Sequence, residues 1–266
     1  SFPTRRSSDL LNERDPAWPD LFRIDIASGA RTLLYRNQDT PSERGFARFV
    51  VDRENNLRLG LRVLTGGGVD VMARTPEADW RRLFTIPFED ALQSYPIGFE
   101  AGGRTFLMYD STGRDRAALV RVDAESGAKT VLGESARADV IDVWLDPMTN
   151  TPEAFAADYL RRDWRALEPD AQADLDFLGA HMSGDPQVVS RSLNDQRWIV
   201  LEDGPTTPPR SYLFDRSDPA NRRLTLLFRH RPSLERAPLQ PMIPFEIEAR
   251  DGLTLVSYLT LPVGSD

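Results

Sequence analysis

Two segments of the sequence repeat each other, and this repeat restricts the fold more than any other feature. LFRIDIASGARTLL at residues 21–34 matches LVRVDAESGAKTVL at residues 119–132, which begins 98 residues further on. SYLFDRSDPANRRLTLLF at residues 211–228 is a looser third copy. Each copy alternates apolar and polar residues, turns through Gly, Asn, Asp or Ser, and alternates again. The pattern predicts β-hairpins with one buried face.

The spacing of the copies predicts a series of similar units. An offset of 98 residues equals two units of about 49, a length typical of propeller and solenoid repeats. Intermediate hairpins are expected at Val69–Phe84 and Ala154–Leu167, which brings the number of outer hairpins to five. Further strands are expected ahead of these hairpins, at Phe46–Leu64, Ile97–Ser111, Val140–Asp146 and Val188–Asp203.

Two strand pairs per unit make a four-stranded blade, and each blade buries its faces against its neighbours. We therefore predict an all-β fold: a partial β-propeller over residues 11–231, with about five four-stranded blades of a ring of seven or eight. Two or three blades would then be missing on the N-terminal side. A β-sandwich with coincidentally similar hairpins is the alternative.

One segment breaks the strand pattern. Glu168–Met182 has Ala171, Leu175, Leu178 and Met182 at helical spacing behind Pro169, which predicts one helix inserted in a blade. Its Asp174 and Asp176 diverge on a helix and do not make a metal site. We expect both to lie on a solvated face.

The first ten residues, SFPTRRSSDL, resemble one reading frame of a common sequencing-adapter oligonucleotide. We interpret residues 1–10 as an artefact, so that the natural protein began upstream; a mobile basic arm is the alternative. The targeting segment would then lie outside the sequence, and either cytoplasm or periplasm fits.

Composition excludes several classes of function. A net charge of −8 and a pI near 5.0 argue against nucleic-acid and anionic-membrane partners. The absence of cysteine excludes disulfides, thiolate zinc sites and a cysteine nucleophile, and it leaves the redox compartment open. No apolar run approaches the about 20 residues that cross a bilayer.

The composition of the chain changes after the last repeat. Pro232, Pro238, Pro241 and Pro244 make residues 232–244 a predicted interdomain linker. FEIEA at residues 245–249, Arg250-Asp251-Gly252 and LTLVSYLTLP at residues 253–262 then predict a second kind of hairpin with an Asp-Gly turn.

A strand, Ala-Arg-Asp-Gly-Leu and a strand ending Tyr-Leu-Thr-Leu-Pro resemble the start of the α/β-hydrolase domain of prolyl oligopeptidase family serine peptidases, especially their acylaminoacyl-peptidase-like bacterial branch. ESARADVIDVWLDP at residues 134–147 and VVSRSLNDQRWIV at residues 188–200 resemble the propeller of that branch. The resemblance implies that residues 245–266 begin a truncated hydrolase domain. It also implies a Ser, Asp and His triad beyond Asp266, short peptides or acyl-peptides as substrates, and a propeller that restricts access.

Chemistry of this kind is missing from the sequence itself. No G-x-S-x-G elbow occurs, and the two histidines, His181 and His230, have no recognisable Ser or carboxylate companion in sequence. Phosphate-loop, dinucleotide and metal-ligand patterns are also missing, so we predict no cofactor. Gly66–Gly68 read as a hairpin turn, and the adjacent Glu89 and Asp90 as a blade-connecting loop.

Two further groups of residues have side chains that could form a site. The tryptophans could stack on a carbohydrate, but their spread over successive units favours packing between blades: Trp18, Trp80, Trp144, Trp164 and Trp198. Arg161 and Arg162 could meet a peptide carboxylate in a central tunnel, but their place in an outer hairpin favours a surface role.

The sequence thus predicts the substrate-gating portion of a serine peptidase whose own hydrolase domain is its main partner, and which is inactive by itself. A stand-alone propeller used for binding or scaffolding is the alternative, and a sugar-processing propeller enzyme is a third reading. The oligomeric state stays open, and a homo-oligomer is compatible with the sequence.

Overall fold

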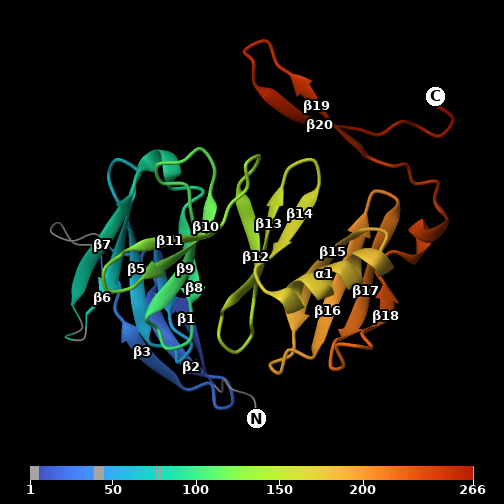
Figure 1. Ribbon diagram of the computed structural model, residues 1–266. Helices are drawn as coiled ribbons and strands as arrows, with labels where there is room; N and C mark the ends of the chain where they lie inside the picture. Colours follow the sequence, from blue (N-terminus) through green and yellow to red (C-terminus); the bar gives the residue numbers. More distant parts are fainter. Residues whose placement is uncertain (1–5, 39–44, 76, 78, 266) are drawn as a thin grey trace. The chain divides into compact units, whose positions relative to one another are not determined.

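The computed structural model describes residues 6–38, 45–75, 77 and 79–265 (Figure 1). Of the predicted adapter-like segment, residues 1–5 lie outside the described residues, and Arg6–Leu11 form a strand, β1. The chain divides into two compact units, residues 1–136 and residues 137–266.

The first unit contains three antiparallel sheets, in each of which consecutive strands are neighbours (Figure 1). The first sheet is β1, β2 (Asp20–Asp25) and β3 (Arg31–Tyr35). The second is β4 (Arg48–Val51), β5 (Leu57–Val63), β6 (Val69–Arg74) and β7 (Trp80–Ile86). A 3₁₀ turn, η1 (Phe88–Asp90), leads to the third, which is β8 (Tyr95–Phe99), β9 (Thr105–Asp110), β10 (Ala118–Asp123) and β11 (Lys129–Gly133).

The second unit has the same sequential order. Its first sheet is β12 (Val140–Leu145), β13 (Pro152–Asp158) and β14 (Arg162–Ala166), followed by helix α1 (Pro169–His181). The next sheet is β15 (Asp185–Arg191), β16 (Arg197–Gly204), β17 (Thr207–Asp215) and β18 (Arg223–Arg229). A second 3₁₀ turn, η2 (Pro232–Arg236), precedes a two-stranded hairpin of β19 (Ile243–Glu248) and β20 (Thr254–Leu259).

These elements confirm the predicted hairpins, the inserted helix and the Asp-Gly hairpin near the C-terminus. The prediction of four strands in every blade is wrong for two of the five sheets that correspond to predicted blades, because β1–β3 and β12–β14 have three strands among the described residues. In the second case α1 follows β14 directly and contacts β13, β14 and β15. The helix therefore covers apolar surface where the chain forms no fourth strand.

The repeated sequence makes a repeated turn. In the first copy, the Asp25 side-chain oxygen accepts hydrogen bonds from the backbone N–H and the hydroxyl of Ser28, and Gly29 has φ 72°. In the second, Asp123 binds Ser126 in the same way, and Gly127 has φ 76°. Glycine adopts this left-handed backbone without steric cost, which is why both copies keep Ser-Gly at this place.

Each unit has its own apolar core. In the first unit, side chains of the sheets β4–β7 and β8–β11 form a cluster that includes the fully buried Val71, Ile86, Phe106 and Met108. An aromatic group of Tyr35, Phe46, Phe49 and Trp80 joins strands β3, β4 and β7, and the Phe46 and Trp80 ring centroids lie 4.4 Å apart.

In the second unit, the apolar core joins the sheets and α1. It contains Trp144, Ala171, Leu178, Trp198 and Phe214, and Trp164 packs against it.

In the first unit, Trp18 packs its ring on Gly45, where an added Cβ would lie 2.4 Å from the ring. The five tryptophans therefore pack within and between the sheets, as the sequence predicted.

Candidate functional site

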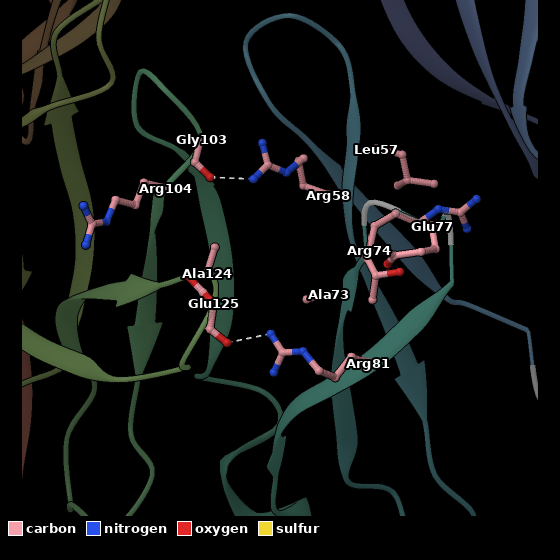
Figure 2. A pocket seen from close by; sticks show the side chains of 11 residues that line it. Leu57, Arg58, Ala73, Arg74, Glu77, Arg81, Gly103, Arg104, Ala124 and Glu125 are labelled. Atoms are coloured by element: carbon pink, nitrogen blue, oxygen red, sulfur yellow. Dashed lines mark hydrogen bonds between the residues drawn. The ribbon is translucent and has the colours of Figure 1, made fainter.

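A cavity in the first unit lies between the ends of two sheets (Figure 2). Its volume is about 760 Å³, within the range of small-molecule sites. Figure 2 shows Arg58 and Arg81 reaching from the second sheet toward the turns of the third. Arg58 Nη2 donates to the carbonyl oxygen of Gly103 at 2.7 Å, and Arg81 Nη2 to that of Glu125 at 2.5 Å. Two arginine bridges therefore span the cavity.

The charges around this cavity are largely balanced. Arg58 forms an ion pair with the buried Asp52 at 3.2 Å, and Arg104 lies 3.8 Å from Asp123. Among the lining residues that the structure describes there is no serine, histidine or cysteine. The cavity offers guanidinium donors, and it has no nucleophile paired with a base.

A buried carboxylate fixes the β8–β9 turn, one wall of this cavity. Glu100 accepts hydrogen bonds from Arg121 Nε at 2.6 Å and Nη2 at 2.7 Å, and from Thr105 Oγ1 at 2.7 Å. Burial by itself disfavours the carboxylate, but these bonds hold the pKa of Glu100 below its ordinary value.

We expect Glu100→Gln to lower the free energy of unfolding at pH 7 by about 2 kcal/mol, because it weakens charge-assisted hydrogen bonds. A lowered pKa in the folded protein means that the carboxylate stabilises the fold above its ordinary pKa, and that this contribution is lost as the pH falls through the lowered value. Urea unfolding of both proteins from pH 7 to pH 3 measures the effect. The difference between them should shrink below about pH 4, and a constant difference would contradict the assignment.

A smaller cavity of about 230 Å³ lies in the second unit. Both arginines considered from the sequence, Arg161 and Arg162, line it. Arg162 forms ion pairs with Asp158 at 2.9 Å and with Asp142 at 3.2 Å, and the hydrogen bond with Asp158 raises the pKa of its guanidinium. Arg161 is exposed. Arg162 therefore bridges strands within its own sheet, which agrees with the surface role expected for the pair.

A serine and a histidine of the second unit form a hydrogen bond that the sequence analysis missed. Ser211 Oγ and His230 Nε2 are 2.8 Å apart, and Ser211 is 4% exposed. In the part of the chain that the structure describes, no carboxylate pairs with His230. Ser211 lies in the middle of β17 and not at a strand-to-helix elbow, so the pair links the middle of β17 to the end of β18 without the geometry of a nucleophile.

The remaining candidates also take structural roles. His181 stacks on Phe177 at the end of α1, with its Nδ1 2.8 Å from the Phe177 carbonyl oxygen. Gly66–Gly68 form the β5–β6 turn, and Glu89 and Asp90 lie in η1 between two sheets, as predicted. Within the described ranges, no group of three or more His, Cys, Asp or Glu side chains is arranged to hold a metal ion. None of the described helices is long and apolar enough to cross a membrane.

The expectation that Asp174 lies on a solvated face is wrong. Asp174 is fully buried and forms ion pairs with Arg222 at 2.6 Å and Arg216 at 2.7 Å, whereas Asp176 is exposed. Asp174 lies three residues after Ala171 and four before Leu178, on the apolar face of α1. That position was the signal in the sequence, and the distant arginines that neutralise Asp174 could not be paired with it from sequence.

Asp174 belongs to a buried charge network of six residues, with Glu153, Arg191, Asp195, Arg216 and Arg222 as the other members. Arg191 contacts Glu153 at 2.6 Å and Asp195 at 2.5 Å, and Arg216 also contacts Asp195. Burial raises the pKa of Asp174 and of Glu153 despite the neighbouring arginines. The charges of the three arginines and the three carboxylates cancel. The network therefore has a structural role, in which it connects α1 to two sheets.

Comparison with solved structures defines the class of fold. A prolyl endopeptidase from a structural study of two such enzymes aligns with 98% of this chain and 38% of its own, with a TM-score of 0.59 and 14% sequence identity. The described residues, which form one α-helix and several antiparallel sheets, thus resemble the propeller domain of prolyl oligopeptidases.

Sequence comparison adds particular relatives. Dipeptidyl aminopeptidase BIII of Pseudoxanthomonas mexicana is 41% identical over 256 residues, which are 96% of this chain and 36% of the relative. Dipeptidyl peptidase family member 6 of Caenorhabditis elegans is 26% identical, over 95% of this chain and 34% of its own. No profile of a known protein family matches the sequence. The chain spans about a third of the length of these curated relatives and matches their propeller portion.

Proposed function

We propose that this chain is the substrate-gating propeller portion of a serine peptidase of the prolyl oligopeptidase family, whose intact form hydrolyses short peptides. The observation that carries the proposal is the 41% identity to a dipeptidyl aminopeptidase over 96% of the chain. An identity of this size along nearly the whole chain supports a shared architecture and not only a shared fold.

In this proposal, the residues that catalyse peptide hydrolysis lie outside residues 1–266. The described residues contain a Ser–His hydrogen bond without an acid partner, and the 760 Å³ cavity has no serine, histidine or cysteine among its described lining residues, so the chain alone is expected to be inactive. The β19–β20 hairpin opens the peptidase domain that supplies the Ser, Asp and His triad, and further blades complete a ring of seven or eight. The predicted linker, residues 232–244, includes η2 and the first two residues of β19, and it connects the two domains.

We expect the substrate specificity of the intact protein to be that of the two named relatives and not that of the acylaminoacyl-peptidase-like branch. One relative is named a dipeptidyl aminopeptidase and the other a dipeptidyl peptidase family member, and these names favour release of dipeptides from a free N-terminus. Release of an acylated residue, as in the acylaminoacyl-peptidase-like branch, is the second form of the proposal.

Recovery of the complete reading frame, followed by an assay of the purified full-length protein, tests the proposal. We expect a G-x-S-x-G elbow downstream, cleavage of dipeptidyl chromogenic substrates, and inhibition by a serine-directed phosphonate. Acetyl-aminoacyl substrates, used as the matched control, should be cleaved at least about tenfold more slowly if the site binds a free amine through a charge-assisted hydrogen bond. Faster cleavage of the acetyl-aminoacyl substrates than of the dipeptidyl substrates would favour release of acylated residues.

A binding or scaffolding propeller is the second candidate. The observation in its favour is the 760 Å³ cavity, which two arginine bridges span and which has no serine, histidine or cysteine among its described lining residues. A complete reading frame without the elbow, and a full-length protein without peptidase activity, would favour this function over the first.

A further inference from the structure

The described residues that line the 760 Å³ cavity of the first unit include more arginines than carboxylates. Four arginines and two glutamates line it, in a chain whose net charge is −8: Arg58, Arg74, Arg81, Arg104, Glu77 and Glu125. The formal charge of these lining side chains is therefore +2. A local excess of positive charge on an acidic protein attracts anions to that place.

The carboxylates that balance two of these arginines are held within their own turns. Asp52, the partner of Arg58, is buried and also accepts hydrogen bonds from the backbone N–H of Asn56 at 2.8 Å and from its side-chain amide at 3.1 Å. Asp123 accepts hydrogen bonds from the backbone N–H and the hydroxyl of Ser126, both at 2.8 Å. Neither carboxylate is among the described lining residues, so neither competes with a ligand for the cavity.

Arg58 and Arg81 extend their guanidinium groups across the cavity (Figure 2). A guanidinium has five N–H donors in a planar fork. Arg81 has one acceptor in the part of the chain that the structure describes, the Glu125 carbonyl oxygen, and forms no ion pair there. Arg58 donates from Nη1 to Asp52 and from Nη2 to Gly103. Both guanidinium groups therefore keep donors for a ligand between them.

The surroundings of Arg58 fix its position and leave space beside it. Its guanidinium lies 5.1 Å from the centre of the Phe99 ring, and an added Cβ on Gly103 would lie 2.3 Å from its Nη1. Only glycine therefore permits this approach. Ala73 and Ala124 lie between the two arginine bridges in Figure 2, and their side chains are small. A donor that is already in place loses little conformational entropy when it binds a ligand.

We propose that this cavity binds a small organic anion, with the carboxylate or phosphate group of the anion between Arg58 and Arg81. Both kinds of group present two oxygens to a guanidinium fork, the pairing that arginine forms best. A volume of about 760 Å³ has room for the rest of a small molecule beside the anionic group. Binding at this site goes beyond the proposed function and does not depend on peptidase activity.

Isothermal titration calorimetry of the full-length protein with two pairs of probes tests the site. Succinate and glycerol phosphate carry the two kinds of anionic group, and succinamide and glycerol are their uncharged counterparts. We expect at least one of the two anions to bind with a dissociation constant of about 1 mM or tighter, and neither uncharged compound to give a saturable signal. The relative affinity for succinate and glycerol phosphate decides between a carboxylate and a phosphate ligand.

Substitutions on β7 show whether the anion binds in this cavity. Arg81→Gln should weaken binding at least about tenfold, and it leaves no buried charge unpaired because Arg81 is exposed. Arg82→Gln is the matched control, because Arg82 is the next residue on β7, is exposed and is not among the described lining residues. Arg81→Lys keeps the charge without the planar fork and should bind with intermediate affinity. Binding that Arg81→Gln retains, an equal loss in Arg82→Gln, or a wild-type protein that binds neither anion would overturn the site.

Discussion

Asp174→Asn is expected to lower the free energy of unfolding by about 3–5 kcal/mol, one of the two largest losses that we predict for a single substitution. The carboxylate is fully buried between Arg216 and Arg222. Without it, two nearly buried guanidinium groups lose their shared counter-ion, and the low dielectric of the interior makes that loss costly. Chemical denaturation of the purified protein, followed by circular dichroism, measures the effect.

Asp176→Asn is the matched control for this prediction, because it makes the same chemical change two residues later on the same helix. Asp176 is exposed, and its neighbour in the structure is Gln172 Nε2 at 2.8 Å. Its substitution should change stability by less than about 0.5 kcal/mol. Equal losses in the two variants would show that helix propensity, and not the buried network, is responsible.

Trp198→Ala is expected to cost about 4 kcal/mol, which makes it the second large effect. Trp198 is 1% exposed and contacts Trp144 and Phe214 edge to face, with ring centroids 5.1 and 5.4 Å away. Its ring also lies 4.3 Å from the Arg191 guanidinium and 4.8 Å from that of Arg216. The substitution would therefore remove apolar core and leave both arginines without an aromatic partner.

Thermal unfolding of Trp198→Ala and Trp198→Phe, side by side with the wild-type protein, separates packing from hydrogen bonding. Phenylalanine keeps most of the ring, but it loses the hydrogen bond from Nε1 to Asp195 Oδ1 at 2.7 Å. We expect this variant to lose about 1–2 kcal/mol, clearly less than Trp198→Ala. A loss as large as that of alanine would mean that the hydrogen bond dominates over the core.

Local sequence patterns were sufficient to predict most of the fold. Alternation and turn residues predicted the hairpins because the two strands of a hairpin are close in sequence, and the Asp-x-x-Ser-Gly turn carries its own hydrogen bonds. The three-stranded sheet β12–β14 was not predicted, because the absence of a fourth strand depends on how α1 packs. The burial of Asp174 was missed for a related reason: its partners, Arg216 and Arg222, lie more than 40 residues further along the chain.

The functional groups were less predictable than the strands. His181 lies at the end of α1 with its Nδ1 next to the Phe177 carbonyl oxygen, Glu89 lies in η1, and Gly66–Gly68 form the β5–β6 turn, positions that local sequence patterns predicted. The contacts of Arg58 with Gly103 and of Arg81 with Glu125 join residues about 45 positions apart, and no short pattern encodes them. Sequence periodicity specifies which residues face inward, whereas the chemistry between sheets depends on how whole sheets are placed.

The sequential order of strands in every sheet has a consequence for how the protein acquires its structure. Each strand pairs with its neighbour in sequence, so the loops that must close are short and the contact order within a sheet is low. Individual sheets should therefore form early, and the docking of sheet on sheet should limit the overall folding rate. Substitutions in the inter-sheet cores would then slow the late docking step, whereas substitutions in the hairpin turns would slow the early one.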